Sequence, residues 1–283
     1  LIDQQSHPTE NKIIAFGQNK ALFNNPAVAY ITRLGSKGSK RTVLSSLRII
    51  AQMLGFSGID TCPWHELKRP HILQILFNLS EKGLSPATQN SYLSSLKGVC
   101  EEAWMLELMS AEDYQKIYKI PSVKGSRLAS GRALESKEVA SLMRSCSQEH
   151  CIVSARDKAI LALLIGCGLR KAEVISLKLE DIDWKDSSFN VIGKGNKQAK
   201  CFMPQQTRTA LKTWLNLRGE HSGYLFSRIL KNGALLSTPI TGQGITCILK
   251  KRGTMAQIDS FAPHDIRRTF ATRMFESGAD ALI

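Results

Sequence analysis

The sequence predicts a mainly helical α+β protein, with a helical N-terminal domain followed by a mixed C-terminal domain that contains a small β-hairpin. Three observations support this prediction. Apolar residues recur at helical spacing through most of residues 26–106. Two short β-prone runs, 189–192 and 201–204, flank a glycine- and lysine-rich loop in the second half. Residues 121–132 are small, flexible and basic, which is typical of a linker between domains.

Length and charge limit the classes of function. The chain has 283 residues, enough for two domains with separate cores. Its 38 lysines and arginines outnumber 24 aspartates and glutamates, and the formal net charge is +14. Because these cations are spread along the chain, we expect nucleic acid as the partner and not a membrane surface. The longest apolar run, 159–169, is too short to span a bilayer.

The cysteines predict neither disulfides nor a metal site. Seven of them are scattered along the chain without a Cys-X-X-Cys pair, which favours reduced thiols in a cytoplasmic protein. Cys146, His150 and Cys151 lie close together in the sequence. No second pair of ligands follows them, so we expect no metal ion.

The N-terminal domain is expected over residues 25–120, after a polar lead-in at 1–24. Its first helix begins at Pro26 and is interrupted by the glycine- and serine-rich stretch 35–39. Further helical segments are predicted at 40–54, 64–67, 71–82 and 87–106. They indicate a compact bundle of about four helices, and since the bundle shows no catalytic spacing we expect it to bind a partner.

The helix over 40–54 has a strongly apolar face and a basic start. Such a group of cations can bind a phosphate backbone, although a solvated helix face has the same composition. The candidate DNA-binding residues here are Lys37, Lys40, Arg41 and Arg48.

The C-terminal domain is expected over 133–283. Its predicted helices are one capped by Ser136, one over 156–165 that ends at the turn 166–168, one over 170–177, and two more over 205–218 and 239–252. The β-runs are joined by a cationic hairpin loop, as expected of a loop that enters a groove. A last helix begins at Pro263 and places His264 and Arg267 on one face.

An imidazole and a guanidinium on one helix face can hold an anion and move a proton on it, which suits phosphate chemistry. Each basic element of this half also has a purely structural explanation. Arg170 can pair with Glu173 three residues later, and a hairpin lysine such as Lys194 is usually solvated.

Four strings in this half nevertheless resemble the tyrosine recombinase (phage integrase) family. They are GCGLRKAEVISL at 166–177, DID at 181–183, VIGKGNK at 191–197 and PHDIRRTFAT at 263–272, and they follow the family's order. The first half resembles the family's helical core-binding domain in pattern and length only. The resemblance implies that residues 25–120 are a core-binding domain and residues 133–283 a catalytic domain. Together they would form a site-specific DNA recombinase or integrase of a mobile element.

The resemblance also implies the chemistry and the partners. In the family, a tyrosine attacks the scissile phosphate, forms a 3′-phosphotyrosyl link and releases a 5′-hydroxyl that later attacks a partner strand. The covalent intermediate conserves the bond energy, so no metal or other cofactor is expected. The expected partners are double-stranded DNA with recombination sites and further copies of the protein in a synaptic tetramer. Localisation is then expected in the cytoplasm, at the nucleoid, without a membrane partner.

The catalytic roles follow from the motifs. Arg170 and Arg267 would hold the non-bridging phosphate oxygens, where negative charge develops in the transition state. Lys194 would protonate the leaving 5′-oxygen, with Lys197 as the alternative acid and as a candidate DNA-binding residue. His264 would orient the phosphate and move a proton to or from the nucleophile.

Two further residues are given supporting roles. Glu173 would hold Arg170 or His264 in place. Arg268 is expected to be a solvated charge or a contact to the DNA backbone.

The sequence departs from the family pattern at the nucleophile. The family pattern continues beyond this helix to a tyrosine, whereas the five tyrosines here all precede His264: Tyr30, Tyr92, Tyr114, Tyr118 and Tyr224. None lies in the family's nucleophile context, and each is better explained as a core or surface aromatic. We therefore expect these 283 residues to bind DNA without cleaving it. A non-catalytic DNA-binding protein of the same fold and, less favoured, a type IB topoisomerase are alternative interpretations.

Overall fold

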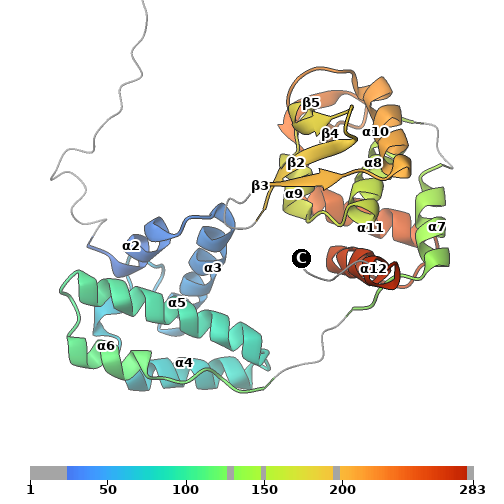
Figure 1. Cartoon of the computed structure of the whole chain (residues 1–283). Helices are drawn as coiled ribbons and strands as arrows, with labels where there is room; N and C mark the ends of the chain where they lie inside the picture. The colour runs from blue at the N-terminus through green and yellow to red at the C-terminus, as the bar shows by residue number, and fades with distance from the viewer. Residues whose placement is uncertain (1–23, 126–130, 148–150, 194–197, 279–283) are drawn as a thin grey trace, which may run out of the picture. The chain divides into compact units, whose positions relative to one another are not determined.

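The computed structural model describes residues 24–125, 131–147, 151–193 and 198–278. The chain divides into two compact units, Leu1–Leu128 and Ala129–Ile283 (Figure 1). Each unit has its own apolar core. The structure is mainly helical with two small antiparallel sheets, which confirms the predicted fold class. The domain limits at 24, 120 and 132 stay predictions.

The N-terminal unit is a helical bundle built around its longest helix. Its elements are α2 (Pro26–Arg33), α3 (Lys37–Met53), the 3-10 turn η1 (Trp64–Glu66), α4 (Arg69–Glu81), α5 (Pro86–Met105) and α6 (Ala111–Tyr118). Each of the other elements packs against α5 and also contacts at least one further element of the bundle. Gly98 of α5 permits one of these contacts, because a side chain at this position would overlap the ring of Tyr30 from α2.

Two predictions for this unit need correction. The helix predicted from residue 40 begins at Lys37, because the Ser36 hydroxyl accepts the Ser39 N–H at 2.9 Å and places Gly38 inside the first turn. The sequence analysis also missed α6, whose eight residues are capped by Ser110. Within the described residues the bundle therefore has five α-helices, compared with about four predicted.

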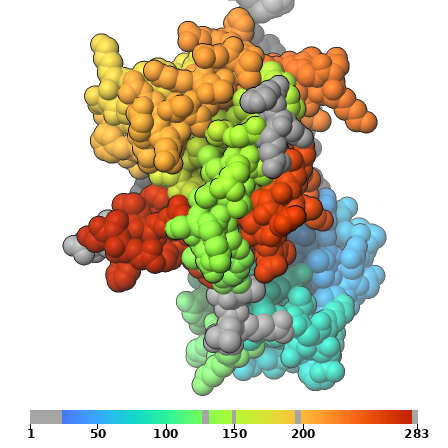
Figure 2. Space-filling model, turned by 90° about the vertical axis from the view of Figure 1, so that its right-hand side faces the viewer, coloured from blue at the N-terminus to red at the C-terminus, as the bar shows by residue number. Residues whose placement is uncertain are grey.

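The C-terminal unit combines helices with both sheets. Its elements are α7 (Ser136–Ser145), α8 (Ile152–Gly166), α9 (Lys171–Ser176), η2 (Leu179–Asp181), β1 (Ile182–Asp183), β2 (Ser188–Ile192), β3 (Gln198–Phe202), α10 (Gln205–Arg218), β4 (Ser227–Ile229), β5 (Leu235–Pro239), α11 (Gly242–Met255) and α12 (Pro263–Glu276). Figure 2 shows α7 on the surface between α11 and α12.

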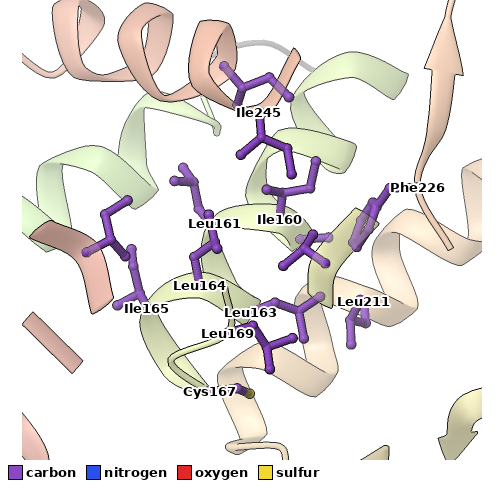
Figure 3. Close-up of a cluster of buried hydrophobic side chains, with 14 of the residues drawn as sticks. Ile160, Leu161, Leu163, Leu164, Ile165, Cys167, Leu169, Leu211, Phe226 and Ile245 are labelled. Atoms are coloured by element: carbon purple, nitrogen blue, oxygen red, sulfur yellow. The ribbon is translucent and has the colours of Figure 1, made fainter. Parts of the chain in front are cut away.

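The helix α8 forms the centre of this unit. Its second half is apolar on all sides, and its residues from Ala159 to Leu164 are at most 5% exposed. Figure 3 shows Leu211 of α10, Ile245 of α11 and Phe226 placed around it. Burying each such side chain stabilises the fold by about 1.5 to 3 kcal/mol. The start of α9 and the helix α12 pack against this scaffold, which fixes the region of the candidate site.

The sheets are small and antiparallel. Strands β1, β2 and β3 form a meander in which Phe189 pairs with Cys201 and Ile192 with Gln198. The second sheet pairs β4 with β5. The helix predicted from residue 239 is wrong at its start, because Pro239 pairs with Ser227 in this sheet and Thr241 caps α11.

The cap predicted for α7 is also wrong by one residue. Glu135 is the N-cap, and the carboxylate of Glu138 accepts its N–H at 2.8 Å. The same carboxylate binds the Arg132 guanidinium through two hydrogen bonds of 2.5 and 2.6 Å. These bonds, the Arg132 pair first and the Glu135 N–H after it, lower the pKa of Glu138 from 4.5 to about 2.

A buried ion pair connects three helices of the unit. Asp157 of α8 and Arg252 of α11 are 1% and 0% exposed, and Arg252 Nε donates to Asp157 Oδ2 at 2.9 Å. Arg252 Nη1 also donates to the carbonyl of Ser145, the last residue of α7, at 3.0 Å. The other carboxylate oxygen of Asp157 accepts from Arg156. One carboxylate thus holds α8, α11 and, through Arg252, α7.

We predict that Asp157→Asn lowers the free energy of unfolding by about 3 to 5 kcal/mol, because it removes the carboxylate that pairs with the buried Arg252 guanidinium. The measurement is urea unfolding at neutral pH. Asp186→Asn is the control, since Asp186 pairs with Lys200 at the surface and its loss should cost less than about 1 kcal/mol. Equal losses in the two variants would contradict the prediction.

We also predict a pH-dependent contribution from Glu138. Its pKa is lower in the folded chain, so its ion pair stabilises the fold above pH 4.5 and this stabilisation disappears as the pH falls toward 2. Glu138→Gln should therefore be less stable than the wild type at pH 7, and the difference should vanish over this range in urea unfolding series. Glu135→Gln, which removes an exposed carboxylate, is the control. A difference that persists at pH 2 would exclude the ion pair as its source.

Candidate functional site

An open cavity of about 370 Å³ lies where α9 and α12 begin. It brings together the predicted site residues Arg170, His264 and Arg267, although Arg170 is far from the other two in the sequence. The residues that line it are Leu169, Arg170, Lys171, Ala172, Ala262, Pro263, His264 and Arg267. Arginine, lysine and histidine are present in this lining, and no acidic residue is among its members.

Arg170 is held at the start of α9 by Glu173. It is the N-cap residue, and its backbone N–H donates to Glu173 Oε2 at 2.7 Å. Its guanidinium Nη1 lies 2.9 Å from Glu173 Oε1. The Glu173 side chain is 7% exposed and that of Arg170 53%, so a buried carboxylate orients a guanidinium that reaches the cavity. Of the two partners predicted for Glu173, the structure places it on Arg170.

Arg267 is positioned by the turn between α8 and α9. Its Nη1 donates to the carbonyl oxygen of Gly168. Gly168 has a φ of +62°, and a side chain here would overlap the ring of Phe270, one turn after Arg267 on α12. Glycine is required for both reasons, the left-handed backbone and the close approach of α12. The turn that ends two residues before Arg170 is therefore interlocked with the helix that carries Arg267.

His264 lies at the exposed start of α12. Pro263 occupies the first helical position, and His264 follows it at the edge of the cavity. The first N–H groups of a helix and the positive end of its dipole favour a bound anion. Asp265 does not oppose this effect at the cavity, because its side chain is buried and accepts the Ala262 N–H at 2.8 Å. The arrangement can bind an oxyanion and place a titratable imidazole beside it.

Sequence reasoning missed Lys171. It lines the cavity, and its Nζ donates to Thr246 Oγ1 of α11 at 3.3 Å. Its position directly after Arg170 in the first motif was a weak signal. Neighbouring residues of a helix point about 100° apart, so helical spacing does not predict that both reach one cavity.

Of the three other residues that the sequence suggests around this site, Arg268 alone is among the described residues. Lys194 and Lys197 are outside the described residues. Arg268 follows Arg267 on α12 but does not line the cavity, and its Nη1 donates to the carbonyl oxygen of Gly131.

The candidate DNA-binding residues of α3 belong to the N-terminal unit. Lys37, Arg41 and Arg48 are exposed and Lys40 is half-buried. Lys37, Arg41 and Arg48 lie along one exposed flank of α3, whereas Lys40, seven residues before Leu47, lies at the edge of the buried face. No acidic side chain in the described part of the chain pairs with any of the four. They therefore form a basic surface that is open to a polyanion.

The described residues contain no group of three His, Cys, Asp or Glu side chains that could hold a metal ion, and His150 falls outside them. Every described helix is also too short or too polar to cross a bilayer.

Comparisons with known proteins agree with the motifs. The profile of the phage integrase family matches residues 132–282. The tyrosine recombinase XerC of Alcanivorax borkumensis is 31% identical over 223 residues, which are 77% of this chain and 70% of that protein. The tyrosine recombinase XerA of Pyrococcus furiosus is 32% identical over 218 residues, 75% of this chain and 68% of the relative.

Solved structures share the fold. A lambda integrase dimer bound to a COC′ core site has a TM-score of 0.65 at 13% identity, over 92% of this chain and 90% of that one. The Tn1549 transposon integrase in complex with transposon right end DNA has a TM-score of 0.65 at 17% identity, over 92% and 88% of the two chains. At these identities the likeness concerns the fold alone.

We predict that Gly168→Ala destabilises the C-terminal unit. The left-handed backbone should cost about 1 to 2 kcal/mol, and the overlap with Phe270 about 1 to 3 kcal/mol more. Gly233→Ala is the matched control, because its φ of +86° carries the same strain while an added methyl meets no atom within 4 Å. The measurement is urea unfolding, and equal losses for both variants would mean that Phe270 does not require the glycine.

Proposed function

This chain belongs to the phage integrase family of tyrosine recombinases, and from that premise we propose that the cavity between α9 and α12 holds the scissile phosphate of a DNA recombination site. The chain is a site-specific recombinase that acts on DNA. The observation that carries the assignment of the site is the convergence of Arg170, His264 and Arg267 on one cavity without an acidic residue in its lining.

The two arginines stabilise the transition state. A phosphodiester under attack gathers negative charge on its non-bridging oxygens, and guanidinium groups already fixed in place bind that charge without reorganising. Glu173 fixes Arg170, and the Gly168 carbonyl fixes Arg267. These anchors support a role for both guanidiniums in binding the phosphate. Lys171 adds a third cation at the edge of the same cavity.

Proton transfer is divided between two residues in this proposal. His264, at the start of α12, orients the phosphate and moves a proton to or from the nucleophile. Lys194 is the general acid for the leaving 5′-oxygen, with Lys197 as the alternative. Both lysines belong to the loop between β2 and β3, and a lysine on such a hairpin loop can reach the leaving group from a DNA groove.

The nucleophile is a tyrosine other than the five in this sequence. Four of these belong to the N-terminal unit, and the fifth, Tyr224, bridges Lys178 in the main chain. None of the five is among the residues that line the cavity. On this proposal the 283 residues by themselves bind DNA, and the covalent 3′-phosphotyrosyl link forms once the tyrosine is supplied.

The N-terminal unit contributes to duplex binding. Lys37, Lys40, Arg41 and Arg48 contact the phosphate backbone, and the exposed basic face of α3 supports this role. Exchange of strands between two duplexes requires an active site for each broken strand, so the protein assembles as a tetramer on paired sites. Because its substrate is DNA, the protein acts at the nucleoid.

We predict that Arg170→Ala and Arg267→Ala each reduce covalent DNA complex formation by at least about 100-fold, because each removes a transition-state contact. Duplex binding and its salt dependence should change little, since contacts elsewhere supply most of the affinity. The assay uses the protein with its nucleophilic tyrosine and a nicked suicide substrate that traps the covalent complex. Arg228→Ala, which removes an exposed cation outside the cavity, should cleave normally.

Normal cleavage by Arg170→Ala or Arg267→Ala would overturn the assignment of the site. Tight binding to a specific DNA site without cleavage by the wild type would instead favour the non-catalytic DNA-binding protein.

A further inference from the structure

We propose that Arg268 is a positioning residue, which with Gly131 ties residues 131–136 onto α12 and so fixes the start of the helix that carries His264 and Arg267. We call residues 131–136 the entry segment, because they lead into α7. The proposal rests on the proposed function of the cavity, and it assigns Arg268 a role other than the DNA contact expected from the sequence.

The Arg268 side chain points away from the phosphate cavity. It lies one residue after Arg267, so it leaves α12 about 100° away from the side chain that reaches the cavity. Its Nη1 donates to the carbonyl oxygen of Gly131. The residue is half-buried, and it is absent from the lining of the phosphate cavity. The Arg268 guanidinium therefore binds a group of the protein itself.

The entry segment also contacts α12 at Thr269 and Arg273. The Leu134 N–H donates to Thr269 Oγ1 at 2.8 Å, and the same hydroxyl donates to the Asp265 carbonyl at 2.8 Å. Leu134 and Thr269 are 4% and 1% exposed. Further along, Arg273 Nη2 donates to Ser136 Oγ at 3.3 Å. Figure 1 shows the chain passing beside α12 before it enters α7.

Gly131 lies very close to the first turn of α12. Its φ is +119°, and a side chain at this position would overlap the carboxylate of Asp265. That carboxylate accepts the Ala262 N–H at 2.8 Å and thereby closes the first turn of α12. Asp265 directly follows His264. A displacement of Gly131 therefore moves the turn that presents His264 to the cavity.

This geometry joins two parts that the sequence treats separately. Gly131 belongs to the predicted linker 121–132, and its carbonyl oxygen accepts a hydrogen bond from Arg268 of α12. Arg268 and Gly131 set how firmly the helix is held at this point.

The experiment compares Arg268→Ala and Gly131→Ala with the wild type. The two variants disturb one contact from its two sides, and only the first changes a charge. Gly233→Ala is the control for left-handed backbone strain, because its φ is +86° and an added methyl meets no atom within 4 Å. Lys40→Ala is the control for a DNA phosphate contact predicted from the sequence.

Hydrogen exchange of the present chain is the first readout. The amides of the entry segment and of the first turns of α12 should exchange about tenfold faster in both variants, since a stabilising contact is lost, and at the wild-type rate in Gly233→Ala. This readout needs no catalysis, so it tests the contact even if the chain does not cleave DNA. Unchanged exchange in both variants would overturn the proposal.

The second readout distinguishes positioning from DNA contact. Loss of one phosphate contact makes the negative slope of log K, the DNA-binding constant, against log salt concentration less steep by about 0.9. We expect this change for Lys40→Ala and not for Arg268→Ala or Gly131→Ala. In the protein with its tyrosine, both of these variants should cleave about 10- to 100-fold more slowly at saturating DNA, because misplacement near the reacting atoms slows the chemical step.

A less steep salt dependence of DNA binding by Arg268→Ala, together with normal cleavage by Gly131→Ala, would identify Arg268 as a DNA contact and overturn the proposal. Absence of cleavage by the wild type would instead contradict the proposed function, and the exchange experiment would still decide whether the contact holds α12.

Discussion

The close approach of Gly168 to α12 is the constraint on which the candidate site depends. Its backbone has a φ of +62°, its carbonyl binds Arg267, and the space where a side chain would lie is filled by Phe270. Arg170 follows two residues later and is oriented by the buried carboxylate of Glu173. One turn thereby determines the relative positions of two guanidiniums that belong to distant parts of the chain.

The position of that turn is fixed by the packing of the helices around it. It ends α8, whose second half is buried at the centre of the unit (Figure 3). The ion pair between Asp157 and Arg252 fixes α8 to α11, and the Arg252 bond to Ser145 adds α7. Buried ion pairs contribute little net stability, but a broken one is costly, so such a pair strongly disfavours alternative packings of these helices.

The helix α12 is held from two directions. The Gly168 turn contacts the side that faces the cavity, and the entry segment contacts another side through Arg268 and Thr269. The cavity between α9 and α12 stays cationic because Asp265 is turned into the protein and Glu173 is paired with Arg170. The two acidic residues close to the site therefore bind donors of the protein, Glu173 a guanidinium and Asp265 a backbone N–H, and do not occupy the place of an anion.

Local patterns were sufficient to predict most of the helices, the β2 and β3 hairpin and the motifs with Arg170, His264 and Arg267. Helical spacing, caps and glycine turns are properties of neighbouring residues, so they can be read along the chain. Short elements were harder, because α6 and β5 have too few residues for a clear period, and the start of α11 was misplaced as a result.

The sequence by itself determined the family and the fold class, and it predicted the principal cations of the candidate site. Only the tertiary structure decided that Lys171 shares their cavity, that Arg268 binds Gly131, and that Asp157 meets Arg252 across the core. These contacts join residues far apart in the chain, and their geometry depends on how α8, α11 and α12 pack. No local pattern of residues specifies that packing.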